Sequence, residues 1–437
     1  MGGALLALTA YGGFELTHQY VERVKLQPEV DEEIKKYQWD VSGEVWQADP
    51  VIGGTDPALG YAGRHALRAA WMAHNWGVGP PELSDIAEGV SPADIPDLYA
   101  AEYLRRALRV AEDKATSSQL RPLTIPALYN LSASLLERMG NAFPDLTKDH
   151  FELAWRGYSG QGLRAAHIAL KLGDISFRRH QNEEAQKWWK ISIQLSQGSA
   201  TPNSVGALLE PTTLPSSPWA QRIVASTLIS LSAFYAQTGK LKDAENFEEH
   251  SLAYLRSIPT PDSITQASPP QALHALFLLQ RSSLLSIHLA EVLSAQKKSI
   301  LSSIQYLTAA AESSERVARA LAGLPLHQNA GTPQLEVPKG EDQISSIFSS
   351  SPSMRPVASR LYRDAKRTSA EAWNLLGVLY EQKEGSASKS ALQCYERAVE
   401  WAGKREGEGI SANEAVTEKD WKVFWSNYQK AKMTAEK

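Results

Sequence analysis

The residues best suited to chemistry are scattered along the chain and form no complete catalytic or metal-binding motif. His167 and His180 have no acidic partner in ligand register, so their spacing does not predict a metal site. The single cysteine, Cys394, cannot form an internal disulfide or a thiolate metal site alone, and we expect a buried thiol. No His-Glu-x-x-His or Gly-x-Ser-x-Gly sequence occurs. We therefore expect no catalytic residue, no metal and no cofactor.

Two further patterns could bind phosphates or bases, and both are incomplete. The glycines around Gly53, Gly54 and Gly60 lack the Gly-Lys-Ser/Thr end of a phosphate loop and follow no clear strand, so we interpret them as a loop. Trp188 and Trp189 could stack on bases only within a basic groove. The chain has 45 Lys+Arg against 49 Asp+Glu and a net charge of -4. We therefore expect core packing for Trp189 and no nucleic-acid partner.

Helical periodicity dominates the chain from Tyr61 onward. Apolar residues recur there at helical spacing, with almost no alternation of the β type, so we predict an all-α protein. Clusters of Pro, Gly and Ser interrupt the pattern at residues 196–218, 257–270 and 324–356. The last of these is the best candidate for a flexible insertion.

Several predicted helix pairs share one internal spacing: a large residue, Leu-Gly and Tyr on the first helix, then small, aromatic and small residues on the second. Three copies follow this spacing well. The first consists of Trp373, Leu376, Gly377, Tyr380, Ala391, Tyr395 and Ala398, and the second of Leu228, Leu231, Ser232, Tyr235, Ala244 and Ser251. The third consists of Leu172, Gly173, Ala185, Trp189 and Ser192. Weaker copies begin at Leu67, Leu128 and Leu289. Glu248 stands where an aromatic residue is expected, so its helix should pack differently or rely on Phe247.

With this spacing the chain resembles the tetratricopeptide repeat family over residues 61–402. The resemblance implies a right-handed superhelix of helix pairs, an α-solenoid with long loop insertions, whose concave face binds peptides or proteins. The physical basis of the pattern is packing, because small residues let the two helices of a pair approach closely. Gly377→Trp should therefore damage the fold.

In this family the concave face is formed by positions two, five and nine of the first helix in each pair. Those positions define the candidate peptide-binding groove, which consists of Tyr129, Ala133, His167, Leu170, Asp174, Ile229, Ala233, Leu284, Ile287, Glu291, Asn374 and Val378. Chaperone-binding members hold a C-terminal carboxylate there with Lys, Asn and Arg, whereas these residues are mostly apolar. We therefore expect an extended hydrophobic segment or a partner helix as ligand. Leu170→Glu and Ile229→Glu should weaken client capture without loss of helicity.

The amino-terminal part differs from the repeat region. Residues 1–14 form an uncharged apolar segment, but its apolar run from Gly2 to Phe14, about 13 residues, is short of the roughly 17–25 that cross a bilayer as a helix. We interpret it as the remnant of a membrane anchor, with a buried helix start and a signal-like segment as alternatives. Residues 15–60 should form a juxtamembrane helix and loop, and residues 403–437 a C-terminal helical cap.

This layout, together with the run from Tyr11-Gly-Gly-Phe-Glu to Tyr37-Gln-Trp-Asp, resembles the fungal mitochondrial adaptor subunits of the inner-membrane i-AAA protease. The resemblance implies a non-enzymatic protein in the mitochondrial inner membrane, with its repeats in the intermembrane space. Its partners would be an AAA metalloprotease and unfolded membrane-protein clients, which it would deliver for protein quality control. Three alternatives stay open: a respiratory-complex assembly factor, a soluble cytosolic or nuclear scaffold, and an enzyme whose pocket the linear sequence hides.

Overall fold

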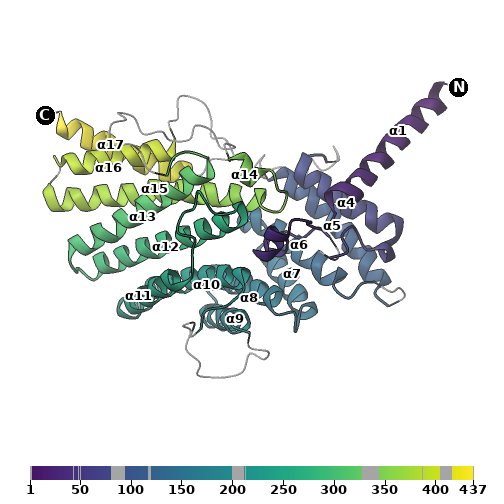
Figure 1. Ribbon diagram of the computed structural model, residues 1–437, viewed down its shortest axis with the longest axis horizontal. Coiled ribbons are helices and arrows are strands. Elements are labelled where there is room, and N and C mark those ends of the chain that lie inside the picture. The colour runs from purple at the N-terminus through teal and green to yellow at the C-terminus, as the bar shows by residue number, and fades with distance from the viewer. Residues whose placement is uncertain are drawn as a thin grey trace. The chain divides into compact units, whose positions relative to one another are not determined.

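The computed structural model of the chain consists of helices, and no strand occurs among the residues that it describes. The described residues are 2–42, 44–47, 49, 51–79, 94–116, 120–198, 211, 213–326, 344–385, 387–403 and 416–436. The central part of the predicted insertion, residues 327–343, therefore lies outside them. The chain divides into two compact units, Met1–Asn203 and Ser204–Lys437 (Figure 1).

The first unit begins with α1 (Gly2–Tyr20), which continues directly into a π-helical turn, Val21–Lys25. Two short helices follow, α2 (Glu32–Lys36) and α3 (Trp39–Ser42). Consecutive longer helices then pack in pairs, namely α4 (Gly60–Trp76) with α5 (Ile95–Lys114), α6 (Thr124–Arg138) with α7 (Pro144–Gly157), and α8 (Leu163–Arg178) with α9 (Asn182–Ser196).

The second unit repeats this pairing and closes with a further helix. Its elements are α10 (Pro218–Gln237) with α11 (Leu241–Ser257), α12 (Pro269–Ala295) with α13 (Ile300–Leu321), the short α14 (Ser346–Ser349), α15 (Arg355–Glu384) with α16 (Lys389–Ala402), and α17 (Glu418–Ala435). In Figure 1, α13 lies alongside α15, and the contacts between these two helices are extensive.

The architecture is helical-repeat-like, because each helix pair predicted from the sequence spacing is present as two consecutive helices in contact. Local signals explain where the helices begin. The side chain of Ser217 accepts a hydrogen bond from the Ala220 amide and precedes Pro218, and Ser388 caps α16 in the same way through the Ala391 amide. Within each unit, neighbouring pairs also contact one another, as α5 does α6 and α11 does α12.

Two of the helix pairs are held together by a glycine packed against an aromatic ring. A Cβ atom at Gly173 of α8 would lie 2.5 Å from Cδ1 of Trp189 on α9. One at Gly377 of α15 would lie 2.5 Å from Cε1 of Tyr395 on α16. Both rings are almost fully buried. Only glycine fits at these two positions, which explains why the predicted spacing places it there.

A buried carboxylate joins three helices of the second unit. Glu315 on α13 accepts hydrogen bonds from Nε1 of Trp373 on α15 at 2.7 Å and from Nε1 of Trp401 on α16 at 2.5 Å. Arg397 of α16 pairs with both of its carboxylate oxygens and stacks over the Trp373 ring at 4.4 Å. Because every donor is directed at one charge, these contacts fix the register of α13, α15 and α16.

In the second half of α1, most of the described side chains are exposed to solvent. Tyr11, Phe14 and Leu16 are exposed, at 58%, 50% and 71%, and the start of α1 extends away from the α4 and α5 helices of its unit (Figure 1). Among the described residues, α12 is the helix whose length and hydropathy would suit a membrane span, and 61% of its apolar window is buried inside the protein. Such burial is also found in the core helix of a soluble protein, so α12 gives only weak evidence of a span.

Candidate functional site

The predicted groove residues of the first unit are partly occupied by contacts within the unit. Ala133 of α6 and Leu170 of α8 are buried, at 0% and 5% exposure, so they belong to the interior. Tyr129 donates its hydroxyl to Glu112, and its ring packs edge-on against His150 at 5.2 Å. Asp174 accepts a hydrogen bond from Nε1 of Trp189 at 3.0 Å. His167 is half-buried. Because Leu170 is buried, Leu170→Glu should damage packing and cannot serve as a surface test.

The groove residues of α10 and α12 lie closer to the surface. Ile229, Ala233 and Leu284 are half-buried, and Glu291 is exposed. Ile287 is the exception, because it belongs to an apolar cluster formed by α12, α13, α15 and α16. The first helices of two neighbouring pairs therefore keep accessible apolar side chains next to one acidic group.

The last two predicted groove residues, on α15, are covered by the C-terminal helix. Nδ2 of Asn427 on α17 donates to Oδ1 of Asn374 at 2.9 Å, and Asn374 is buried. Val378 packs in a cluster that includes Tyr428 and Ala431 of α17. At this end of the chain, α17 thus occupies the face that a ligand would otherwise contact.

The pair α10 and α11 lacks the glycine–aromatic contact and uses polar groups instead. The hydroxyl of Ser232 lies 2.7 Å from Oε1 of Glu248 and 2.8 Å from Nδ1 of His288 on α12. Glu248 is fully buried, and burial raises the pKa of its carboxyl group to about 8. Burial also lowers the pKa of His288 to about 4. The Ser232 hydroxyl donates to Oε1 of Glu248, and its oxygen can accept from Nδ1 of a neutral His288.

Ser232, Glu248 and His288 are the residue types of a hydrolytic triad, but their order is different. In a triad the histidine lies between the serine and the acid, so that it can take the hydroxyl proton. Here Ser232 lies between the other two and is fully buried. The arrangement therefore couples three helices and does not activate a nucleophile.

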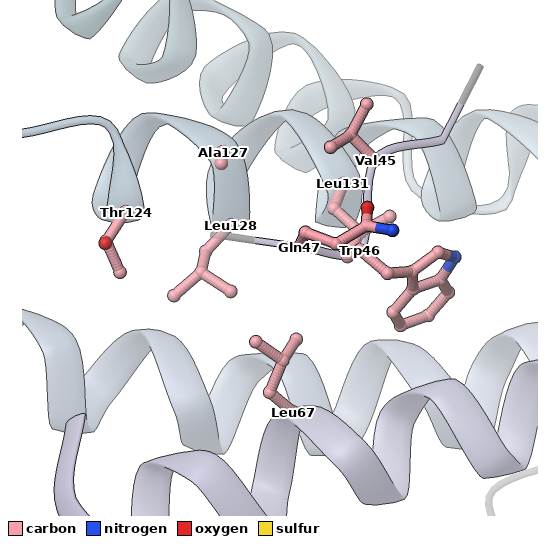
Figure 2. Close-up of a pocket in the computed structure, with 8 residues that line it drawn as sticks. All are labelled: Val45, Trp46, Gln47, Leu67, Thr124, Ala127, Leu128 and Leu131. Atoms are coloured by element: carbon pink, nitrogen blue, oxygen red, sulfur yellow. The ribbon is translucent and has the colours of Figure 1, made fainter. Parts of the chain in front are cut away.

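An extended segment that the sequence pattern did not single out lies in a crevice between α4 and α6. We call residues 44–47 the arm; Figure 2 shows its residues Val45, Trp46 and Gln47 beside the crevice. The arm residues Val45, Trp46 and Gln47 form one wall of the small space that remains there, and Leu67, Thr124, Ala127, Leu128 and Leu131 of the helices line the rest. Trp46 is 7% exposed and joins the apolar cluster of α4, α5 and α6. The arm is thus bound by the helix pairs as a peptide would be.

The arm also places a carboxylate among charged groups. Glu44 pairs with Arg138 at the end of α6 and lies 3.6 Å from Nε2 of His74 at the end of α4. His74 contacts Oδ1 of Asp97 through Nδ1 at 2.5 Å, and the Trp46 ring stacks on it at 5.5 Å. No sequence motif marks this cluster, because its members are distant in the chain and only the fold brings them together.

The cysteine and the two neighbouring tryptophans, which could have been reactive or ligand-binding, pack against other parts of the protein. Cys394 is buried, and burial raises the pKa of its thiol to about 12, which keeps it protonated. Trp189 is fully buried, as expected, while Trp188 is half-buried and packs edge-on against Trp155 at 5.1 Å. Within the described residues, no group of three or more His, Cys, Asp or Glu side chains is arranged to hold a metal ion.

No protein family and no curated protein matches the chain. Among solved structures, the chain is similar to the crystal structure of BtubC (BKLC) from P. vanneervenii, with a TM-score of 0.38 and 18% sequence identity. That similarity covers 65% of this chain and 99% of the other. A likeness at this level assigns no function.

Proposed function

We propose that the chain is a non-enzymatic, protein-binding adaptor of the tetratricopeptide repeat type. The observation that carries the proposal is the contact of Gly173 with Trp189 and of Gly377 with Tyr395. Both glycines occupy the positions where the repeat spacing requires close approach of the two helices. Arrays of such pairs serve as extended binding surfaces for other proteins.

The accessible side chains of α10 and α12 supply a surface for this role. Ile229, Ala233 and Leu284 are half-buried apolar residues on the first helices of two pairs. Apolar surface of this kind stabilises binding of unfolded hydrophobic segments at about 25 cal/mol per Å² buried, before ordering costs. Glu291 adds one acidic group, which would favour clients with a basic flank.

We further propose that the clients are unfolded membrane proteins and that the partner is the i-AAA protease of the mitochondrial inner membrane. This part of the proposal is supported by the sequence layout described above. It is also supported by the exposed Tyr11, Phe14 and Leu16 of α1, which would suit contact with a lipid surface. Affinity purification of the tagged chain from gently solubilised membranes, followed by mass spectrometry, tests it. Recovery of respiratory-complex subunits, or of unrelated soluble proteins, would contradict the protease as partner and identify those proteins instead.

The binding surface is tested by one substitution and a matched control. Leu284→Glu places a charge on the proposed surface, while Leu301→Glu makes the same change on α13, where Leu301 is 58% exposed. A urea-unfolded membrane protein is diluted into buffer with the purified chain, and its aggregation is followed by light scattering. We expect the wild type and Leu301→Glu to suppress aggregation, and Leu284→Glu to do so several-fold less. Equal suppression by both variants would contradict the assignment.

A further inference from the structure

The crevice between α4 and α6 is already filled by a segment with the features of a peptide ligand. The arm, residues 44–47, has the sequence Glu-Val-Trp-Gln. Two of its side chains make most of the described contacts: Trp46 enters the apolar cluster, and Glu44 pairs with Arg138. Gln47 adds a weaker contact, because its Nε2 donates to the carbonyl of Gln27 at 3.3 Å.

Removing the arm would leave a receptor with an apolar part and a cationic part. The apolar part is formed by Leu67, Leu128 and Leu131, which line the crevice (Figure 2). The cationic part is formed by Arg138, and His74 also faces Glu44 there. Asp97 contacts both groups, at 4.0 Å from Arg138 and 2.5 Å from His74, so it would hold them in place. Such a site complements an aromatic side chain next to a carboxylate.

The arm lies in a loop whose two ends meet, so its release would not pull apart the helices. The amide of Gly54 donates to the carbonyl of Leu26 at 2.6 Å. Next to this contact, the carboxylate of Glu22 accepts hydrogen bonds from the amide and hydroxyl of Thr55 and pairs with Arg64 of α4. These contacts close the base of the loop independently of Glu44 and Trp46.

From these observations we infer that the α4–α6 crevice is a receptor for an extended protein segment that carries a carboxylate two residues before an aromatic residue, and that the arm competes with this segment. The inference deepens the proposed function and rests on it, because it names the chemistry of one partner segment. A tethered competitor has a high effective concentration, so the crevice binds such a segment weakly until the arm is displaced. The arm therefore raises the concentration of the partner segment that is needed to occupy the crevice.

The test uses the purified full-length chain and a fluorescein-labelled peptide with the sequence of residues 41–50. In the variant Glu44→Gln/Trp46→Ser the arm loses both anchors. We expect fluorescence anisotropy to show binding of the peptide at least tenfold tighter to this variant than to the wild type. Gln47→Ala, which keeps both anchors, is the matched control and should behave like the wild type. Circular dichroism verifies that the variants stay folded, and Glu44→Gln alone serves as a milder release variant.

Arg138→Glu, added to the release variant, supplies the specificity control. It should abolish binding of the peptide, and a peptide with lysine in place of the glutamate should regain at least part of it. Absence of binding to a folded release variant would overturn the inference, as would binding that is indifferent to Arg138→Glu. A wild-type dimer that dissociates in the release variant would assign the crevice to the arm of a second copy and would also overturn it. None of these outcomes affects the Leu284→Glu test, so the two proposals can fail separately.

Discussion

Neighbouring helices in this chain are joined by two different kinds of contact. In the pairs α8/α9 and α15/α16, a glycine removes the side chain that would separate the helices, and a buried aromatic ring fills the space. In the pair α10/α11, Ser232 takes the place of the glycine and Glu248 the place of the ring. The first contact depends on close packing, to which hydrogen bonds from Trp189 to Asp174 and from Tyr395 to Glu381 are added. The second depends on a proton, because a buried carboxylate without a cation is costly. The same repeat position can therefore be filled by a close-packed ring in one pair and by a buried acid in another.

The largest effect should come from filling the glycine position. Gly377→Val would place branched carbons against the Tyr395 ring, where a Cβ alone already lies 2.5 Å from Cε1. We expect a loss of about 3 kcal/mol in the free energy of unfolding, measured by urea denaturation, since overpacking in a rigid core is costly. Gly173→Val should behave in the same way. Arg363→Ala, at an exposed position of α15, is the control and should be nearly neutral. A fully stable Gly377→Val variant would show that the pair repacks easily.

The second experiment converts one kind of contact into the other. Ser232→Gly leaves Glu248 without its hydroxyl partner, and Glu248→Tyr places a ring against Ser232. Each change should destabilise the protein, and the double variant should recover about 2 kcal/mol relative to the sum of the single changes. The measurement is a double-mutant cycle of urea unfolding. Additive effects would mean that the α10/α11 spacing cannot accept the glycine–aromatic contact.

The third experiment tests whether Glu248 is protonated in the folded protein, by measuring how stability depends on pH. Burial raises the pKa of Glu248 to about 8, so the folded protein keeps a proton that the unfolded chain releases at its ordinary, lower pKa. The stability that this group contributes is therefore lost as the pH rises toward 8. The difference in unfolding free energy between the wild type and Glu248→Gln should decrease between pH 5 and pH 8, by at most about 1.4 kcal/mol per pH unit.

The comparison with Glu248→Gln cancels the opposite trend of His288. Its lowered pKa of about 4 means that the folded protein excludes a proton, so its contribution is lost as the pH falls. Glu312→Gln, at an exposed position of α13, is the control for removing a carboxylate. A difference that stays constant from pH 5 to pH 8 would show that Glu248 is already ionised in the folded state.

The smallest perturbation uses Cys394 on α16 as a reporter of the α15/α16 contact. Because its thiol is buried and its pKa is raised to about 12, reaction with a maleimide should be at least a hundredfold slower in the native protein than in urea. Gly377→Val should accelerate labelling, which mass spectrometry follows over time, whereas Glu248→Gln should not. Equal acceleration by both variants would mean that the two contacts belong to one cooperative unit.

The repeated spacing predicted the helix pairs well, because residues such as Gly377 and Tyr395 act within one pair and lie close in sequence. It also marked Glu248 as the exception, although it could not supply the partner His288, which comes from another pair. The candidate surface was harder to predict. Asn374 and Val378 are covered by α17, and Leu170 is buried, since exposure depends on helices that the local pattern does not contain.

The contacts of the arm, residues 44–47, were even less predictable from the local sequence than the candidate surface. Glu44, His74 and Arg138 come from three separate segments of the chain, and none of them has a spacing that predicts the others. From the sequence, the arm falls within the predicted juxtamembrane helix and loop of residues 15–60, and nothing there marks it. Its role depends on a crevice that forms only when α4 and α6 are in place.

The charge that joins α13, α15 and α16 has a practical consequence for engineering. Glu315 holds these helices in register through Trp373 and Arg397, so the connection between α13 and α14 is not needed for that purpose. The two ends of this connection are adjacent, because the amide of Ser345 donates to the carbonyl of Leu321 at 2.8 Å. Lengthening a closed loop costs only about 0.6 kcal/mol for each doubling. A fluorescent protein could therefore be inserted here, or new chain termini opened by circular permutation, while the helices keep their packing.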